Sequence, residues 1–203
     1  YKVFAAENSA YSEVTWYYPI GTGDTEITNY VTYNYEENLW SVGTLDRGAW
    51  FDSGMGDSPI ATGVDTDTAA TYNYLYSHET GFDADGSAMT ASVESSQMDI
   101  GDGYQFNFIR QLIPDITFEG STSEENPTVT FTLQARNGPG SAYATNSSGA
   151  STRTASTPVE QFTDIVDVRL RGRAFNMKLE STNQGVSWKL GTPRIDIRPD
   201  GRR

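Results

Sequence analysis

His78 is the single histidine of the chain, and it lies in the segment Tyr76–Gly81 beside groups that could exchange protons with it. Glu79 and Asp83 are near enough in sequence to pair with it as a base. Ser77 precedes it, but adjacent residues of a strand point to opposite faces, so Ser77 is not a nucleophile that His78 could activate. We therefore expect a histidine that is packed or hydrogen-bonded at the end of a strand.

A second chemical candidate is the D-x-D-G pattern formed by Asp83, Asp85 and Gly86, with Asp99 and Asp102 as further oxygen donors. A calcium loop needs six to eight oxygens, usually including a later carboxylate, and the residues after Gly86 supply none at that register. An Asp-Gly pair also forms a tight hairpin turn without metal. The turn is the favoured interpretation, and no metal site is predicted.

Catalysis by paired carboxylates stays open, because 27 Asp and Glu residues offer many pairs. Glycoside hydrolysis depends on how two carboxylates are separated in space, which spacing along the chain does not reveal. The sequence has no Gly-rich phosphate loop, no G-x-S-x-G elbow and no cysteine for a thiolate zinc site or a disulfide. We predict no catalytic residues and no cofactor.

The most unusual residues are the arginines of the last 39 positions. Five of them form the candidate contact site: Arg169, Arg171, Arg173, Arg194 and Arg198. On strands, the first three share one face, as do the last two. A basic ladder could bind phosphates, but Asp167, Asp196 and Asp200 are interleaved with it. Because Arg pairs with carboxylates in bidentate fashion, we expect ion pairs within this chain or with an adjacent subunit rather than nucleic-acid contacts.

The charge of the chain is unevenly distributed. Residues 1–164 carry 5 Lys/Arg against 23 Asp/Glu, a net of −18, whereas residues 165–203 carry 9 against 4, a net of +5. The larger part would repel nucleic acid, and the smaller part is suited to an acidic surface, including that of the chain itself.

The elements that must position these residues read as strands. Alternation is clearest in Tyr30–Tyr35, and Tyr33–Trp40 has the spacing of a β-propeller hairpin, although any β-sandwich could hold such a hairpin. Further strands are expected in these ranges: 2–6, 13–18, 48–51, 70–78, 88–94, 106–112, 116–119, 128–135, 166–171, 174–180 and 186–190.

The predicted fold is all-β and antiparallel, with propeller-like blades in residues 1–104 and a β-sandwich-like or closing-blade block in residues 105–203. Residues 138–158 are rich in Ser, Thr, Ala and Gly without apolar periodicity. We expect them to form a flexible loop or arm that makes few contacts with its own domain.

Apolar runs are too short to span a bilayer, so no membrane insertion is expected. The sequence starts at Tyr1 without a methionine and inside a strand-like run, which indicates a C-terminal piece of a longer polypeptide.

Several segments, in their order, resemble the C-terminal portion of tail hub, nozzle or packaged-DNA stabilisation proteins of short-tailed bacteriophages. No single segment is diagnostic, and the resemblance depends on their order and on the terminal Asp-Gly-Arg-Arg. The segments that carry the resemblance are Trp16–Pro19, Tyr33–Trp40, Gly43–Trp50, Tyr76–Gly81, Pro114–Asp115, Arg171–Arg173 and Arg194–Arg203.

The resemblance implies a structural virion protein of the phage tail, in a homo-oligomeric ring that is a hexamer in most such proteins. It would contact other tail or portal-adaptor proteins, retain packaged DNA and form part of the ejection conduit, through which DNA passes without sequence-specific binding. The alternatives are a host-receptor-binding adhesin, which needs an aromatic patch, and a tail-borne polysaccharide hydrolase, which needs two carboxylates in an aromatic cleft.

Overall fold

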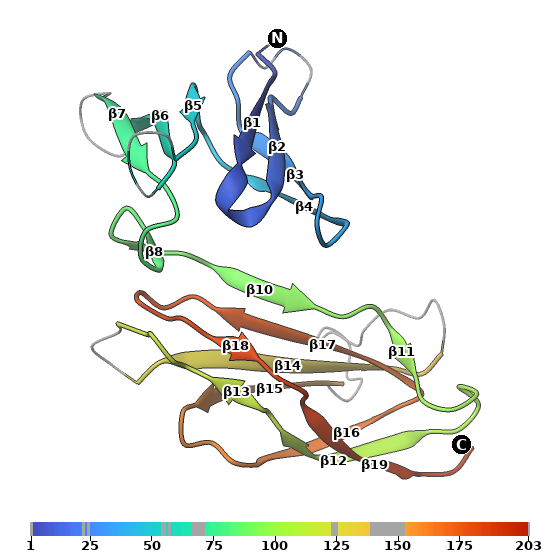
Figure 1. Ribbon diagram of the computed structural model, residues 1–203. Helices are drawn as coiled ribbons and strands as arrows, with labels where there is room; N and C mark the ends of the chain where they lie inside the picture. Colours follow the sequence, from blue (N-terminus) through green and yellow to red (C-terminus); the bar gives the residue numbers. More distant parts are fainter. Residues whose placement is uncertain are drawn as a thin grey trace. The chain divides into compact units, whose positions relative to one another are not determined.

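The chain folds into two compact units, Tyr1–Thr80 and Gly81–Arg203, each built from antiparallel strands (Figure 1). The computed structural model describes residues 2–21, 23, 25–53, 56, 58–65, 72–122, 126–138 and 153–202. Within these ranges there is no α-helix, and one 3-10 turn, η1 (Ser9–Tyr11), is the only helical element. None of the sheets closes on itself. The all-β, antiparallel class predicted from the sequence is confirmed.

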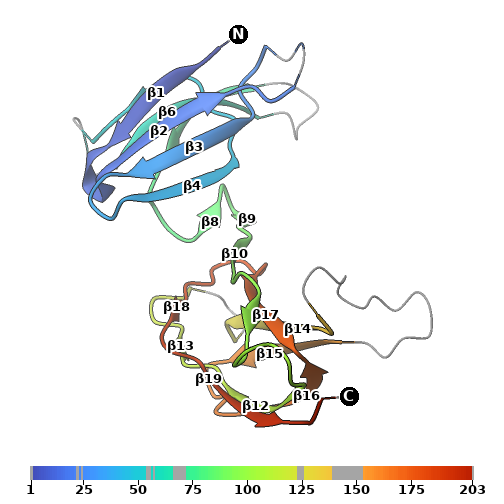
Figure 2. The same cartoon turned by 90° about the vertical axis from the view of Figure 1, so that its right-hand side faces the viewer.

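The first sheet of unit 1 has four strands that pair in chain order (Figure 2). They are β1 (Phe4–Asn8), β2 (Glu13–Tyr18), β3 (Asn29–Asn34) and β4 (Leu39–Thr44). Neighbouring strands pair in order because the connections between them are short. Asn38, with φ of 57°, takes the left-handed conformation in the β3–β4 turn, which asparagine tolerates better than most residues.

The second sheet of unit 1 has the order β5-β6-β7. Its strands are β5 (Trp50–Phe51), β6 (Ile60–Asp65) and β7 (Tyr72–Ser77). Trp50 links the two sheets, because its ring centroid lies 6.0 Å from that of Tyr17 and its indole N–H donates to the Glu7 carbonyl at 3.0 Å. One face of the β1–β4 sheet, the inner face, therefore lies toward this second sheet.

Unit 2 contains two larger sheets. The first has the order β10-β17-β14-β15, and β11 also pairs with β17. Its strands are β10 (Ala91–Glu94), β11 (Met98–Asp99), β14 (Thr128–Arg136), β15 (Thr154–Glu160) and β17 (Ala174–Ser181). The second sheet is β16-β12-β19, formed by β16 (Val166–Gly172), β12 (Asn107–Ile113) and β19 (Arg194–Pro199).

Two small two-stranded sheets complete unit 2, and only the first of them is a hairpin. They are β8 (Asp83–Ala84) with β9 (Ser87–Ala88), and β13 (Ile116–Thr117) with β18 (Lys189–Leu190). In the first hairpin Asp85 and Gly86 both have positive φ, 50° and 75°, as a two-residue hairpin turn requires. The turn interpretation of this Asp-Gly pair is confirmed.

One hydrophobic core holds unit 2 together, and both larger sheets contribute to it. Leu170 and Ile109 come from the β16-β12-β19 sheet, while Phe131, Phe175 and Leu179 come from the other. Full burial of side chains of this size stabilises the fold by about 1.5–3 kcal/mol each. The alternating burial of β14 and β16 follows directly from their apolar/polar alternation.

The boundary between the two units lies between Thr80 and Gly81, ahead of the 104/105 boundary expected from the sequence. The reason is strand pairing. β10 and β11, which the sequence analysis grouped with the first block, both pair with β17 of unit 2.

The expected loop at 138–158 requires a correction for its last residues. Thr154–Pro158 belong to β15, which pairs with β14 over a register that runs from Thr128↔Glu160 to Gln134↔Thr154. Their backbone groups bond to a neighbouring strand, so a strand without an apolar run is stable here. Residues 139–152 of this predicted loop lie outside the described residues. Among the described residues, no helix is long and apolar enough to cross a membrane.

Candidate interaction surfaces

The outer side of the β16-β12-β19 sheet carries arginines. We call this surface the arginine face and define it by Arg110, Arg169, Arg171, Arg194 and Arg198. It forms because burial alternates along β16 and because Ile195 and Ile197 of β19 pack against the same core as Val168 and Leu170, which leaves the arginines on the other side. Phe108 lies between two of them, since its register partners are Arg171 and Arg198.

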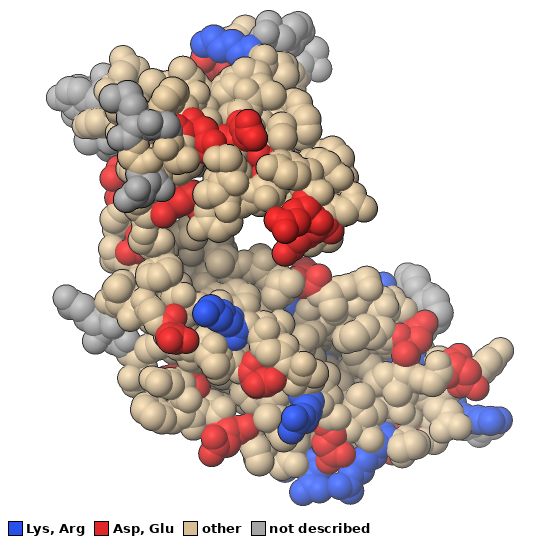
Figure 3. All heavy atoms as spheres, viewed as in Figure 1, with Lys and Arg blue, Asp and Glu red and all other residues tan. Residues whose placement is uncertain are grey.

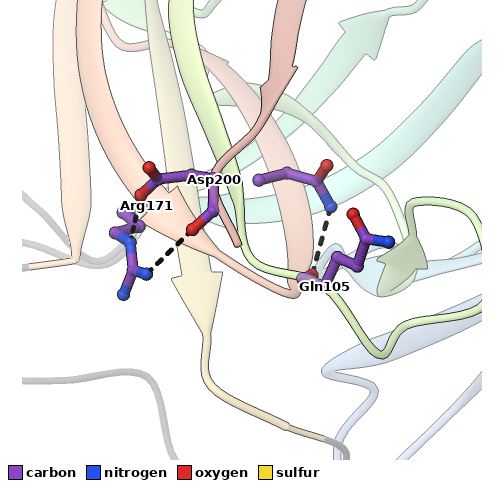
Figure 4. Close-up of polar contacts among 4 residues, drawn as sticks. Gln105, Arg171 and Asp200 are labelled. Atoms are coloured by element: carbon purple, nitrogen blue, oxygen red, sulfur yellow. Dashed lines mark hydrogen bonds and ion pairs between the residues drawn. The ribbon is translucent and has the colours of Figure 1, made fainter. Parts of the chain in front are cut away.

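Arg171 is fixed by contacts within the chain. Its guanidinium pairs with the Asp200 carboxylate, and Nη2 donates to the Asp200 carbonyl at 3.1 Å (Figure 4). It also stacks over the Phe106 ring at 4.0 Å from the centroid. Figure 4 also shows the Gln105 carbonyl, which accepts a hydrogen bond from the Asn107 side chain. Arg171 therefore fastens the segment after β19 to the start of β12.

Arg173 follows β16 and is held in the same cluster. Its guanidinium lies 4.6 Å from the Phe106 centroid, and its terminal nitrogens donate to the carbonyls of Asn137 at 3.3 Å and Arg202 at 3.2 Å. Phe106 is itself bound by backbone hydrogen bonds to Asp200 and Gly201. Arg171 and Arg173 therefore serve the internal structure of unit 2.

The other arginines of this face are much less engaged. Arg198 approaches Asp196 at 3.5 Å, and both side chains are largely exposed, so the pair contributes little. Arg110, Arg169 and Arg194 are exposed and make no side-chain hydrogen bond or ion pair with any described residue. Of the five arginines predicted as ion-pair residues, Arg171 and Arg198 have carboxylate partners in this chain, while Arg173 binds carbonyls.

A second surface is the side of the β1–β4 sheet away from the second sheet of unit 1. We call it the outer aromatic face; it consists of Val14, Trp16, Val31, Tyr33, Trp40 and Val42, which the register places on one side. Trp40 and Val42 are 64% and 75% exposed. The rings of Trp16 and Tyr33 flank Trp40, with centroids at 6.0 and 4.6 Å and interplanar angles of 24° and 30°.

The inner face of the same sheet is polar. Asn8, Thr15 and Thr32 are buried there beside Tyr17, whose pKa is raised to about 12, chiefly by burial. The inner face thus buries polar side chains together with aromatic ones such as Tyr17, on which the Phe4 ring stacks. Apolar side chains are exposed on the outer face, which departs from the usual arrangement of apolar residues inside. An exposed apolar surface flanked by polar residues is typical of a site where another molecule packs.

A cavity of about 250 Å³ lies against this inner face, lined by residues that include Glu13, Tyr30, Trp50, His78 and Glu79. Burial, and next the charge of Glu79, raises the pKa of Glu13. The Glu79 carboxylate accepts a hydrogen bond from the Asn8 amide at 3.3 Å. Sequence analysis did not pair these two glutamates, because they are far apart in the chain and only the fold brings them to one cavity.

His78 borders this cavity as a structural residue. Arg47 Nε donates to His78 Nε2 at 3.0 Å, and the His78 ring packs 4.6 Å from that of Trp50. Burial, followed by the Arg47 charge, lowers the pKa of His78 to about 4. A neutral ring whose acceptor nitrogen is occupied is a poor general base at neutral pH. The expected packed, hydrogen-bonded histidine directly after a strand is confirmed.

The candidate calcium ligands serve other contacts. Asp83 accepts a hydrogen bond from the Gly185 backbone at 2.6 Å, and Asp102 accepts one from the Tyr104 backbone at 3.2 Å. In the described part of the chain, no group of three or more His, Cys, Asp or Glu side chains is arranged to hold a metal ion.

Comparisons with known proteins leave the family open. No protein-family model matches the chain, and no curated protein is significantly similar to it in sequence.

Proposed function

We propose that this chain is a structural virion protein of a short-tailed phage, part of the tail hub or nozzle, that works through assembly surfaces and not through catalysis. The observation that carries the proposal is the outer aromatic face. A sheet that buries threonines and exposes Trp40 and Val42 is suited to packing of a second molecule or sheet over the exposed side.

The topology supports the same proposal. Four antiparallel strands in chain order are the arrangement of one β-propeller blade, and blades pack on both faces. We infer that the β1–β4 sheet is such a blade and that its outer aromatic face is a blade-to-blade contact. Unit 2, in which two sheets share one core, fits the sandwich-like block that the sequence predicted.

Electrostatics fits a conduit for DNA. Unit 1 carries 2 Lys/Arg against 12 Asp/Glu, a net of −10. Figure 3 shows acidic side chains in separate groups on the visible surface of unit 1, most of which belongs to uncharged residues. Such a wall repels phosphates, so that DNA moves past without binding.

Two experiments test this role. Immunogold labelling of phage particles whose genome encodes the chain should place it in the tail; particles that lack the protein would contradict the proposal. Phage carrying Val42→Asp should contain less of the protein than wild type, because the outer aromatic face could no longer be covered. Ile165→Asp, at an exposed apolar residue of unit 2, is the matched control and should be incorporated normally.

A receptor-binding adhesin is the second candidate, since Trp16, Tyr33 and Trp40 form a nearly parallel aromatic group on which a sugar ring could stack. Quenching or enhancement of Trp fluorescence by a glycan, lost in Trp40→Ala, would favour it. The polysaccharide hydrolase is less favoured. Although Glu13 and Glu79 line one cavity, its 250 Å³ is below the ~300 Å³ at which ligand pockets usually begin.

A further inference from the structure

Three of the five arginines of the arginine face form no ion pair with a described residue, although unit 2 as a whole carries 12 Lys/Arg against 15 Asp/Glu. These arginines, Arg110, Arg169 and Arg194, are exposed, lie on three different strands of one sheet and bind no side chain among the described residues. Ile113, the register partner of Arg194, is 41% exposed, and Phe108 lies between Arg171 and Arg198. The surface therefore offers guanidinium groups around apolar side chains.

Unit 1 carries an excess of negative charge, with 2 Lys/Arg against 12 Asp/Glu. Its two cations are engaged elsewhere: Lys2 pairs with Glu26 at 2.6 Å, and Arg47 binds His78 while stacking over Tyr76. Glu36 and Glu37, in the turn between β3 and β4, are exposed and form no ion pair with a described residue.

Exposed apolar side chains lie beside these two glutamates. Tyr35 and Leu39 flank the turn, and Trp40 follows it on β4. We call residues Tyr35–Trp40 the acidic hairpin. It presents carboxylates next to aromatic rings, which is the complement of guanidinium groups next to Phe108 and Ile113.

We propose that the arginine face of one copy of this chain binds the acidic hairpin of a second copy. Arginine pairs with carboxylates in bidentate fashion and also stacks on aromatic rings, so Glu36, Glu37 and the exposed Tyr35 provide both kinds of contact. The inference rests on the proposed structural role and names the partner of one of its surfaces.

Charge determines the geometry of this contact. Two acidic hairpins facing each other would repel, and so would two arginine faces. Each copy therefore contributes one surface of each kind, either reciprocally in a two-fold dimer or head to tail in a ring or filament. Asp167 and Asp196 lie on the arginine face as well and repel a phosphate backbone, which carries a charge at every nucleotide, more than a hairpin that carries two carboxylates.

The test is a charge-swap experiment on the full chain. Sedimentation velocity should show association at low salt that weakens as salt is added. Arg169→Glu with Arg194→Glu, or Glu36→Lys with Glu37→Lys, should each weaken self-association about 10- to 100-fold, and mixing the two double variants should restore it. Lys189→Glu, on β18, and Glu119→Lys change exposed charges outside the β16-β12-β19 sheet of unit 2 and should leave association unchanged.

Three outcomes would overturn the inference. They are a chain that stays monomeric at low salt, reversed variants that still associate like wild type, and a mixture that fails to recover. Loss of salt-sensitive DNA binding in the arginine variant, with association intact, would instead assign the face to nucleic acid. None of these results changes whether the protein is found in the phage tail, so the two proposals are tested separately.

Discussion

The side-chain hydroxyls of Thr15 and Thr32 lie 2.7 Å apart on paired strands and are buried on the inner face of the β1–β4 sheet. Each hydroxyl depends on the other, because a buried polar group without a partner is expensive. Thr32→Val should therefore destabilise unit 1 by about 1–2 kcal/mol, while Thr15→Val with Thr32→Val should cost much less. Urea unfolding of the three proteins measures this. A double variant that loses about twice as much as Thr32→Val would show that the two hydroxyls act independently.

Val42→Lys should leave the free energy of unfolding within about 0.5 kcal/mol of wild type, because the side chain is already mostly in water. It should also reduce binding of the dye ANS, which reports exposed apolar surface. Val93→Lys, at an exposed apolar residue of unit 2, is the control for nonspecific charge effects. A large loss of stability at Val42 would mean that the outer aromatic face is covered within the chain.

His78 should titrate far below an ordinary histidine. Because it is the only histidine, its ring signals in a proton NMR titration need no assignment by mutation. Burial and the Arg47 charge should give a pKa of about 4, and a value near 6.5 would contradict the packing described here.

The same shift has a consequence for stability. Between pH 6.5 and about 4 the unfolded chain binds a proton that the folded chain does not, so unit 1 loses stability as the pH falls through this window. Allowing for the partial exposure of the ring, the loss is on the order of 1 kcal/mol. His78→Gln should remove this part of the pH dependence. The raised pKa of Glu13 acts in the opposite direction, and Glu13→Gln separates the two.

Arg171 and Arg198 should differ, although the sequence treats them alike. Arg171→Ala removes an ion pair, a hydrogen bond and a stacking contact and should destabilise unit 2 by about 1–2 kcal/mol. Arg198→Ala removes one long, exposed pair and should cost less than about 0.5 kcal/mol. Chemical denaturation compares the two, and equal effects would contradict the assignment of Arg171 as a fastening residue.

Strand periodicity predicted much of the fold. Glu13–Tyr18 was predicted with its observed bounds, and most other strands shifted by one to three residues. β6 and β15 were missed, because Gly63 interrupts one and Ser, Thr and Pro dominate the other. Pro158 lacks an N–H but is tolerated in β15, which lies at the edge of its sheet. Hydrogen bonding to neighbouring strands determines whether such segments form strands, and local residue preferences do not reveal which strands become neighbours.

The candidate surfaces were predicted only in part from the sequence. Alternation correctly placed Arg169 and Arg171 on one side of a strand. The sequence does not reveal that Arg171 forms an ion pair with Asp200 while Arg169 forms none with a described residue. Alternation also could not say which side of Tyr30–Tyr35 is buried. Here Thr32, not Val31 or Tyr33, lies inside, because the second sheet covers that side.

The strand order of the two units implies different folding rates. In the first sheet of unit 1 every strand pairs with the next one in the chain, so its contacts are local and should form early. In unit 2 the central strand β12 pairs with β16 and β19, which are both distant in the chain. The pairing of Ile109 with Ile197 therefore requires a long loop to close. Unit 1 should therefore reach its native state first, and refolding followed by pulsed hydrogen exchange should protect the amides of β2 and β3 before those of β12.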